Sequence, residues 1–174
     1  MSESSADRLR RLAAAIGEEG IEVQSPRVAE VRELARRLKA DPQLADALIP
    51  LMDDPDPAVA RAAIDHAPAF DPRATARLRA IAGGPDPDRR SAALSALARR
   101  KDRSILPMAL ARLDGPDPVA RDEALGWLAW LLRPDELVDA LDRRPDLADE
   151  PPVVAARREA FRRAVALGFL AVED

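Results

Sequence analysis

Cysteine and histidine, the side chains that most often serve as nucleophiles, general bases and transition-metal ligands, are almost missing from this 174-residue chain. Cysteine is absent, which excludes thiolate nucleophiles, disulfides and Cys-based metal sites. His66 is the single histidine, so one chain cannot build a paired-His metal site or a His-Glu-x-x-His helix. A lone histidine beside a predicted helix end is more typical of a surface or half-buried residue than of an acid or base. We therefore expect no catalytic residue, no metal site and no cofactor.

The other side chains with distinctive chemistry are arginines, because Lys39 and Lys101 are the only lysines among 27 basic residues. The planar guanidinium binds carboxylates and phosphates through two parallel hydrogen bonds. A genome rich in arginine codons would produce the same bias without any binding role. The arginines that we single out as candidate partner-binding residues lie in the middle of the chain: Arg73, Arg77, Arg79, Arg103 and Arg112.

A repeated Pro-Asp-Pro mark predicts the elements that must position these arginines. It occurs at residues 55–57, 85–87 and 116–118, and successive copies are 30 and 31 residues apart. Asp before Pro is typical of a helix start: the carboxylate accepts backbone N–H groups of the first turn, and Pro at the first helical position gives up a donor that the helix does not use. Ser25-Pro26, Asp41-Pro42 and Asp71-Pro72 are read in the same way.

Apolar periodicity between these marks predicts pairs of helices, with no strand pattern anywhere. A small residue followed by two large or small apolar ones at helical spacing recurs on the first helices, as in Ala93, Leu94 and Leu97 or Ala124, Leu125 and Leu128. Pro50 should break the second helix of its pair, whereas Pro107 falls in a first turn. The first helices are expected near 26–39, 57–67, 87–100 and 118–132, and the second helices near 42–52, 72–82, 105–113 and 134–143.

These elements predict a single all-α domain over residues 1–174 with about ten helices. A cap helix would lie within 1–20, four helical-hairpin repeats within 25–144, and a second cap helix within 151–174. The last segment is apolar on more than one helix face, so we expect it either to fold back over the last repeat or to form a homodimer.

Composition narrows the function classes further. The net charge of −4 argues against a general polyanion binder, whose affinity depends on neutralising phosphates. No apolar stretch approaches the length of a membrane span, and the polar first residues do not form a secretory signal. A cytoplasmic location is therefore expected.

The residues at 54–63 and 115–125 resemble HEAT repeats, particularly the short form of bacterial HEAT-like proteins. Their sequences read Asp-Pro-Asp-Pro-Ala-Val-Ala-Arg-Ala-Ala and Gly-Pro-Asp-Pro-Val-Ala-Arg-Asp-Glu-Ala-Leu. Ile105-Leu106-Pro107 is similar to the start of a HEAT second helix. The resemblance covers residues 25 to 132 and implies an α-solenoid, a right-handed superhelix of HEAT-like hairpins in which second helices line the concave side. It also implies that Asp86, Arg90, Asp117 and Arg121 bond between neighbouring repeats.

If the second helices line a groove, the two central ones carry the five arginines and the outer two carry Asp46, Asp135, Glu136, Asp139 and Asp142. Such a groove fits a protein or peptide partner with an acidic patch. Charges on any solvated helix face would produce the same pattern.

The sequence therefore predicts a non-catalytic scaffold or adaptor that binds a protein partner on its concave face. The alternative is a nucleic-acid-binding or DNA-repair protein of the HEAT-like glycosylase type, with Trp127 and Trp130 as its aromatic residues. Those two tryptophans lie on a first helix, where packing explains them better. A HEAT-like phycobilin lyase finds little support in a chain without cysteine, and a HEAT-like deoxyhypusine hydroxylase lacks its His-Glu pairs.

Overall fold

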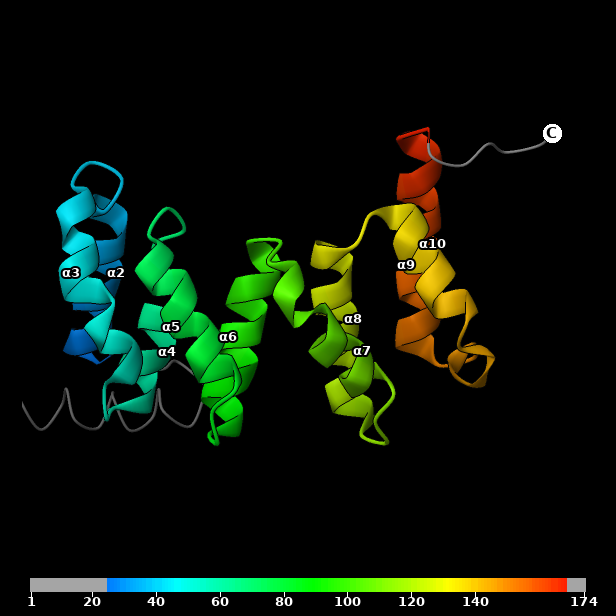
Figure 1. The fold of residues 1–174 in the computed structure, drawn as a ribbon, viewed down its shortest axis with the longest axis horizontal. Helices are drawn as coiled ribbons and strands as arrows, with labels where there is room; N and C mark the ends of the chain where they lie inside the picture. The colour runs from blue at the N-terminus through cyan, green and yellow to red at the C-terminus, as the bar shows by residue number, and fades with distance from the viewer. Residues whose placement is uncertain (1–24, 169–174) are drawn as a thin grey trace, which may run out of the picture. The chain divides into compact units, whose positions relative to one another are not determined.

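A computed structural model describes residues 25–168 of the chain (Figure 1). In this range nine α-helices and four short 3-10 segments occur and no strand is found, so the predicted all-α class is confirmed. The cap helix expected within 1–20 lies outside the described residues. None of the described helices combines the length and the apolar character that a membrane span requires.

Contacts divide the chain into unit 1 (Met1–His66) and unit 2 (Ala67–Asp174), which are described separately. Unit 1 contains α2 (Pro26–Arg37), α3 (Ala45–Leu48) and α4 (Pro57–Asp65). As predicted, Pro50 interrupts the second helix of the first pair, which continues as a 3-10 segment, Pro50–Asp53. Helix α4 packs against α2 and this segment.

Unit 1 contains a buried carboxylate, Asp54, that contacts two of its helix starts. Asp54 is only 8% exposed and accepts hydrogen bonds from both terminal nitrogens of Arg27, one of them at 3.1 Å. It also accepts the backbone N–H of Asp56 at 3.0 Å, just before α4 begins. A buried carboxylate needs such partners, because desolvation disfavours its charged form. The start of α2 is thereby joined to the start of α4.

Unit 2 contains six α-helices, all at positions that the sequence predicted. Helix α7 begins after a 3-10 segment, Arg103–Ile105, so Pro107 lies in its first turn and keeps the helix intact. The bounds are α5 (Pro72–Ala82), α6 (Pro87–Arg99), α7 (Leu106–Leu113), α8 (Pro118–Leu131), α9 (Pro134–Asp142) and α10 (Pro151–Ala166).

The predicted aspartate caps are present at the helix starts. Asp86 accepts the N–H groups of Asp88 and Arg89 at 3.0 and 3.1 Å, and Asp117 accepts that of Val119 at 3.0 Å. Asp56, Asp41 and Asp71 make equivalent bonds. Ser25 is the exception: its side chain makes no cap bond, and its backbone carbonyl accepts from Val28 and Ala29 instead.

The helices of unit 2 stack in a repeating order. Helix α5 packs against α6, α7 against α8 and α9 against α10, while α8 contacts both α6 and α10. Helix α10 therefore packs against α8 as α8 packs against α6. In the described residues the C-terminal helix folds onto the last repeat, which is the first of the two arrangements predicted for it, and it occupies the place of a further first helix.

The predicted apolar stripe forms the core of this stack. Ala93, Leu94 and Leu97 of α6 are at most 3% exposed, and Leu125 and Leu128 of α8 at most 4%. These side chains lie at positions that repeat with the helix starts. Burial of the stripe in two successive first helices is the main apolar contribution that holds the repeats of unit 2 together.

The family-implied roles of Arg90 and Arg121 need correction. Each donates to the carbonyl of a glycine six residues earlier, Arg90 to Gly84 at 3.2 Å and Arg121 to Gly115 at 2.8 Å. Arg121 also pairs with Glu150 at 2.7 Å, immediately before α10. These arginines close the loop before their own helix, and the expected Asp–Arg bonds between repeats are replaced by Arg121–Glu150.

Asp102 joins α5 to the start of α7. Its carboxylate accepts the N–H of Ser104 at 3.1 Å and pairs with Arg79 at 2.8 Å, and its side chain is 10% exposed. Burial alone would raise the pKa of Asp102, but the hydrogen bonds from Arg79 and Ser104 outweigh burial and hold the pKa below its usual value.

Truncation of the stripe should destabilise the protein. Leu94→Ala and Leu125→Ala are each expected to lower the unfolding free energy by about 2–5 kcal/mol, because each leaves a cavity in a closely packed core. Val119→Ala, at a 69% exposed position of α8, serves as the control and should change it by less than about 0.5 kcal/mol. Denaturant unfolding measures all three, and equal midpoints would contradict the proposed core.

Acid should weaken the contacts through which Asp102 joins Arg79 of α5 to the start of α7. Because the folded-state pKa of Asp102 is lowered, its contribution is present above the unfolded pKa of about 4 and is lost as the pH falls below that value. Asp102→Asn should lower the unfolding free energy at pH 7 and make the loss between pH 5 and about 2 shallower than in the wild type. Asp139→Asn, at an exposed position of α9, is the control and should reproduce the wild-type pH curve.

Candidate functional site

The structure offers no cluster with evident catalytic chemistry among residues 25–168. His66 follows the end of α4 and is exposed, as a lone surface histidine would be. No group of three or more His, Asp or Glu side chains in this range could hold a metal ion. The search for a site therefore turns to binding surfaces.

The five sequence-predicted arginines lie in unit 2, on α5 and around α7. Arg73, Arg77 and Arg79 are exposed on α5. Arg73 pairs with Asp71 at 2.6 Å, and its hydrogen bond holds the pKa of that carboxyl below the usual value. Arg79 pairs with Asp102, so Arg73 and Arg79 each contact a carboxylate of the chain itself.

Arg103 continues a series of ion pairs between repeats. It lies directly after Asp102, the partner of Arg79, and contacts Glu136 of α9 at 3.4 Å. The pKa of Glu136 is lowered, first by the backbone N–H of Arg133, which it accepts at 2.9 Å, and then by Arg103. Glu136, predicted as part of an acidic end of the groove, is thus partly neutralised by arginines.

Arg112 belongs to an internal network. It pairs with Glu123 of α8 at 2.8 Å, and its guanidinium lies 5.5 Å from the ring centre of Trp127. Glu123 also accepts the hydroxyl of Ser91 at 3.0 Å, and the Trp127 indole donates to Ser95 at 2.9 Å. The network links α7 and α8 to α6, and it leaves the Arg112 side chain only 33% exposed.

The five arginines therefore do not converge on one site. Arg79 and Arg103 join successive repeats, Arg112 stabilises the packing of α8, and Arg73 lies at the start of α5. Carboxylates of the chain screen these four arginines, which lowers the charge that they present to a partner.

A second surface was not predicted from the sequence. A hollow of about 570 Å³ lies where the connections before α7 and α9 meet α8 and α10. Trp130 is 54% exposed in its lining and Leu167 is 60% exposed. We call it the Trp130 hollow, and its lining consists of Lys101, Arg103, Ala129, Trp130, Leu131, Leu132, Arg133, Pro134, Arg163 and Leu167.

Two of the four cations in the Trp130 hollow contact no carboxylate within residues 25–168. Arg103 and Arg133 contact Glu136 and Asp135. Lys101 and Arg163 have no carboxylate partner among the described residues. Four cations beside an exposed indole can hold a carboxylate or phosphate next to an apolar group.

Lys101 occupies an unusual backbone position. Its φ of 57° lies in the left-handed region, and its N–H and that of Asp102 bond to Ala98 and Leu97 at the end of α6. Glycine is the usual residue at this position of a helix end, and a side chain there costs roughly 1 kcal/mol. A lysine at this point directs a cation to the hollow despite that cost.

The two tryptophans show how much of the Trp130 hollow could be inferred from the sequence. Trp127 is 3% exposed and hydrogen-bonded, so the packing interpretation is confirmed for it. Trp130, three residues further along α8, is instead exposed in the hollow. The Trp-x-x-Trp pair was visible in the sequence, but the cations of the Trp130 hollow come from three separate segments that only the fold brings together.

Comparisons with known proteins identify the repeats. Residues 22–98 match the family model described as HEAT repeats, whereas no curated protein and no solved structure matches the chain. The match extends from α2 to the last turn of α6 and ends before Lys101, the first residue that lines the Trp130 hollow. The helix starts at constant spacing and the stacked pairs of unit 2 agree with it. Residues 22–98 of the chain are therefore similar to HEAT repeats.

Proposed function

We propose that this protein is a non-catalytic interaction scaffold or adaptor that binds an acidic segment of a protein partner. The observation that carries the proposal is the Trp130 hollow, whose lining combines four cations with an exposed indole. Stacked helical repeats offer extended surfaces of this kind for partner binding. A cytoplasmic location belongs to the same proposal.

The lining specifies the chemistry of the partner segment. Trp130 and Leu167 suit one large apolar side chain, and Lys101 and Arg163 suit carboxylates on either side of it. Of the sequence-predicted residues, Arg103 lines the hollow itself. Arg73, Arg77 and Arg79 are exposed on α5 and offer further contacts to an acidic partner, whereas Arg112 contributes through the packing of α8.

The alternative is nucleic-acid binding, and one observation favours it. An exposed tryptophan beside cations is also a platform on which a base can stack. The net charge of −4 and the pairing of Arg73, Arg79, Arg103 and Arg112 with carboxylates favour the protein partner. A compact acidic segment needs only a local basic site, whereas a nucleic acid presents phosphates along its whole length.

Charge reversal in the hollow should abolish binding of acidic peptides. We expect Lys101→Glu/Arg163→Glu to weaken binding of Asp- and Glu-rich peptides that carry one Leu or Phe by tenfold or more, and to slow their association. Arg36→Glu/Arg37→Glu on α2 is the matched control and should leave the affinity nearly unchanged. Fluorescence anisotropy with labelled peptides measures both, and equal losses from both pairs would show that only net charge matters.

Salt dependence separates the two functions. At about 150 mM salt we expect no measurable binding of duplex or single-stranded oligonucleotides, while the acidic peptides remain bound. Trp130→Ala should weaken peptide binding and leave the unfolding free energy nearly unchanged, because the indole is exposed. Tight oligonucleotide binding that falls steeply with salt and is lost in Trp130→Ala would favour the alternative.

A further inference from the structure

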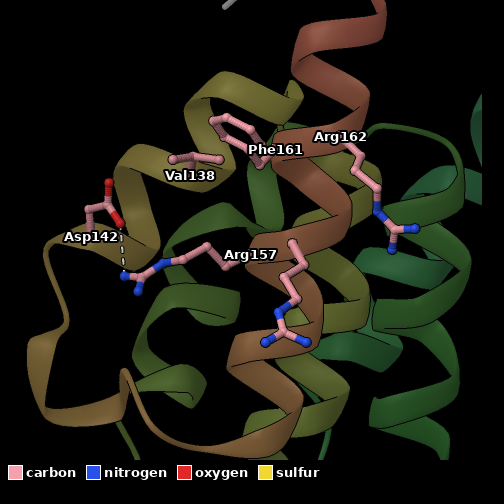
Figure 2. A pocket seen from close by; sticks show the side chains of 6 residues that line it. Val138, Asp142, Arg157, Phe161 and Arg162 are labelled. Carbon is pink, nitrogen blue, oxygen red and sulfur yellow. Dashed lines mark ion pairs between the residues drawn. The ribbon is translucent and has the colours of Figure 1, made fainter. Parts of the chain in front are cut away.

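A second hollow lies between α9 and α10, on residues that the proposed function does not use. It has a volume of about 680 Å³ and is lined by Val138 and Asp142 of α9 and by Arg157, Arg158, Phe161 and Arg162 of α10. Figure 2 shows Phe161 and Val138 side by side, with Arg157 extending from α10 to Asp142. Phe161 is 48% exposed, which is unusual for a large aromatic residue next to a helix–helix contact.

A comparison of equivalent positions in the repeats shows how α10 differs from α6 and α8. Helices α6, α8 and α10 all begin at a proline, Pro87, Pro118 and Pro151, so their positions can be compared directly. The sixth, seventh and tenth residues after that proline form the apolar stripe in the first two helices. In α10 the same three positions hold Arg157, Arg158 and Phe161.

Burial changes together with the residue types. In α6 and α8 the three stripe residues are at most 4% exposed. In α10, the last described helix, the side chain of Arg157 is 33% exposed, and Arg158 and Phe161 are exposed. Two arginines keep this end of the stack hydrated, as a terminal repeat requires, but the aromatic residue at the third position is retained.

The charges around Phe161 specify what fits there. Helix α10 carries four arginines, at 157, 158, 162 and 163, and one acidic residue, Glu159, so its net charge is +3 in a chain whose net charge is −4. Arg157 is held in place by Asp142 at 2.8 Å and by the carbonyl of Leu141 at 3.2 Å. Arg158 has no ion pair among the described residues. Arg162 extends away from α9 in Figure 2 and pairs with Glu159 of its own helix at 3.0 Å, an exposed pair in which the Arg162 side chain stays 74% exposed.

We propose that the α9–α10 hollow docks an acidic amphipathic helix of a protein partner. An apolar side chain of that helix packs against Phe161 and Val138, and its carboxylates bind Arg158 and Arg162. The docked helix covers the stripe positions of α10, which are buried in the preceding first helices. This is helix-in-groove recognition, in which an apolar anchor provides affinity and flanking charges provide selectivity.

A second copy of this chain is a poorer occupant. A twofold interface brings the same patch of both copies together, so the arginines of one α10 would face those of the other. Like charges at an interface are unfavourable, whereas an acidic helix neutralises them. The homodimer through the C-terminal helix therefore serves as an outcome of the test.

The probe is a designed 18-residue peptide with leucines at helical spacing on one face and glutamates beside them, added to the full-length protein. Its matched control has lysine in place of every glutamate. We expect the acidic peptide to bind and the basic peptide not to bind. Phe161→Ala and Arg158→Glu should each weaken binding by about tenfold or more, as loss of a central anchor does.

Two controls keep the result specific. Phe70→Ala removes another exposed phenylalanine, 58% exposed before α5, and should not change binding. Lys101→Glu/Arg163→Glu, which disables the Trp130 hollow, should retain most of the binding, so failure of this proposal and failure of the proposed function are distinguishable. Equal binding of both peptides, or unchanged affinity in Phe161→Ala, would overturn it. So would a dimer in light scattering that Phe161→Ala converts to a monomer.

Discussion

The structure depends most on one local interaction, the aspartate carboxylate that accepts the first backbone N–H groups of a helix beginning with proline. It is repeated at Asp56, Asp86 and Asp117, with distances of 2.9–3.1 Å. Each cap fixes where its helix begins, and the spacing of caps fixes which side chains meet in the stack. A shift of one residue in a helix start would turn the apolar stripe of that helix by about 100° away from its neighbours.

The same constraint explains why the sequence predicted the helices of unit 2 so well and its binding surfaces less well. Caps, prolines and apolar spacing are local signals, and α5 to α9 lie where they indicated. The tertiary fold decides which carboxylate each arginine contacts. The partners are 23 to 33 residues apart in the sequence, in the pairs Arg79–Asp102, Arg103–Glu136 and Arg121–Glu150. The sequence showed an excess of arginine on the second helices but not its neutralisation.

Trp130 illustrates the limit in physical terms. A tryptophan three residues from a buried one lies about 300° around the helix, on a face that is covered only if another element packs there. The side of α8 that carries Trp127 is covered by Ser95 of α6 and Arg112 of α7. Trp130 faces the hollow, where both cations and apolar side chains such as Leu132 and Leu167 form the lining but leave the indole 54% exposed. Sequence spacing cannot distinguish the two cases.

The distribution of paired and unpaired cations then separates structural charge from binding charge. An arginine bound to a carboxylate of its own chain has already exchanged water for a fixed partner, and a ligand must compete with that partner. Arg73, Arg79 and Arg112 are in this situation, and Arg103 is so more weakly at 3.4 Å. Lys101, Arg158 and Arg163 contact no carboxylate in the described part of the chain, and each lines a hollow together with an exposed aromatic residue. Neighbouring repeats cover each other's apolar side chains and pair each other's charges. Where an exposed aromatic ring and a cation lie together in a hollow, a bound protein can provide the apolar contact and the carboxylate that a neighbouring repeat provides elsewhere.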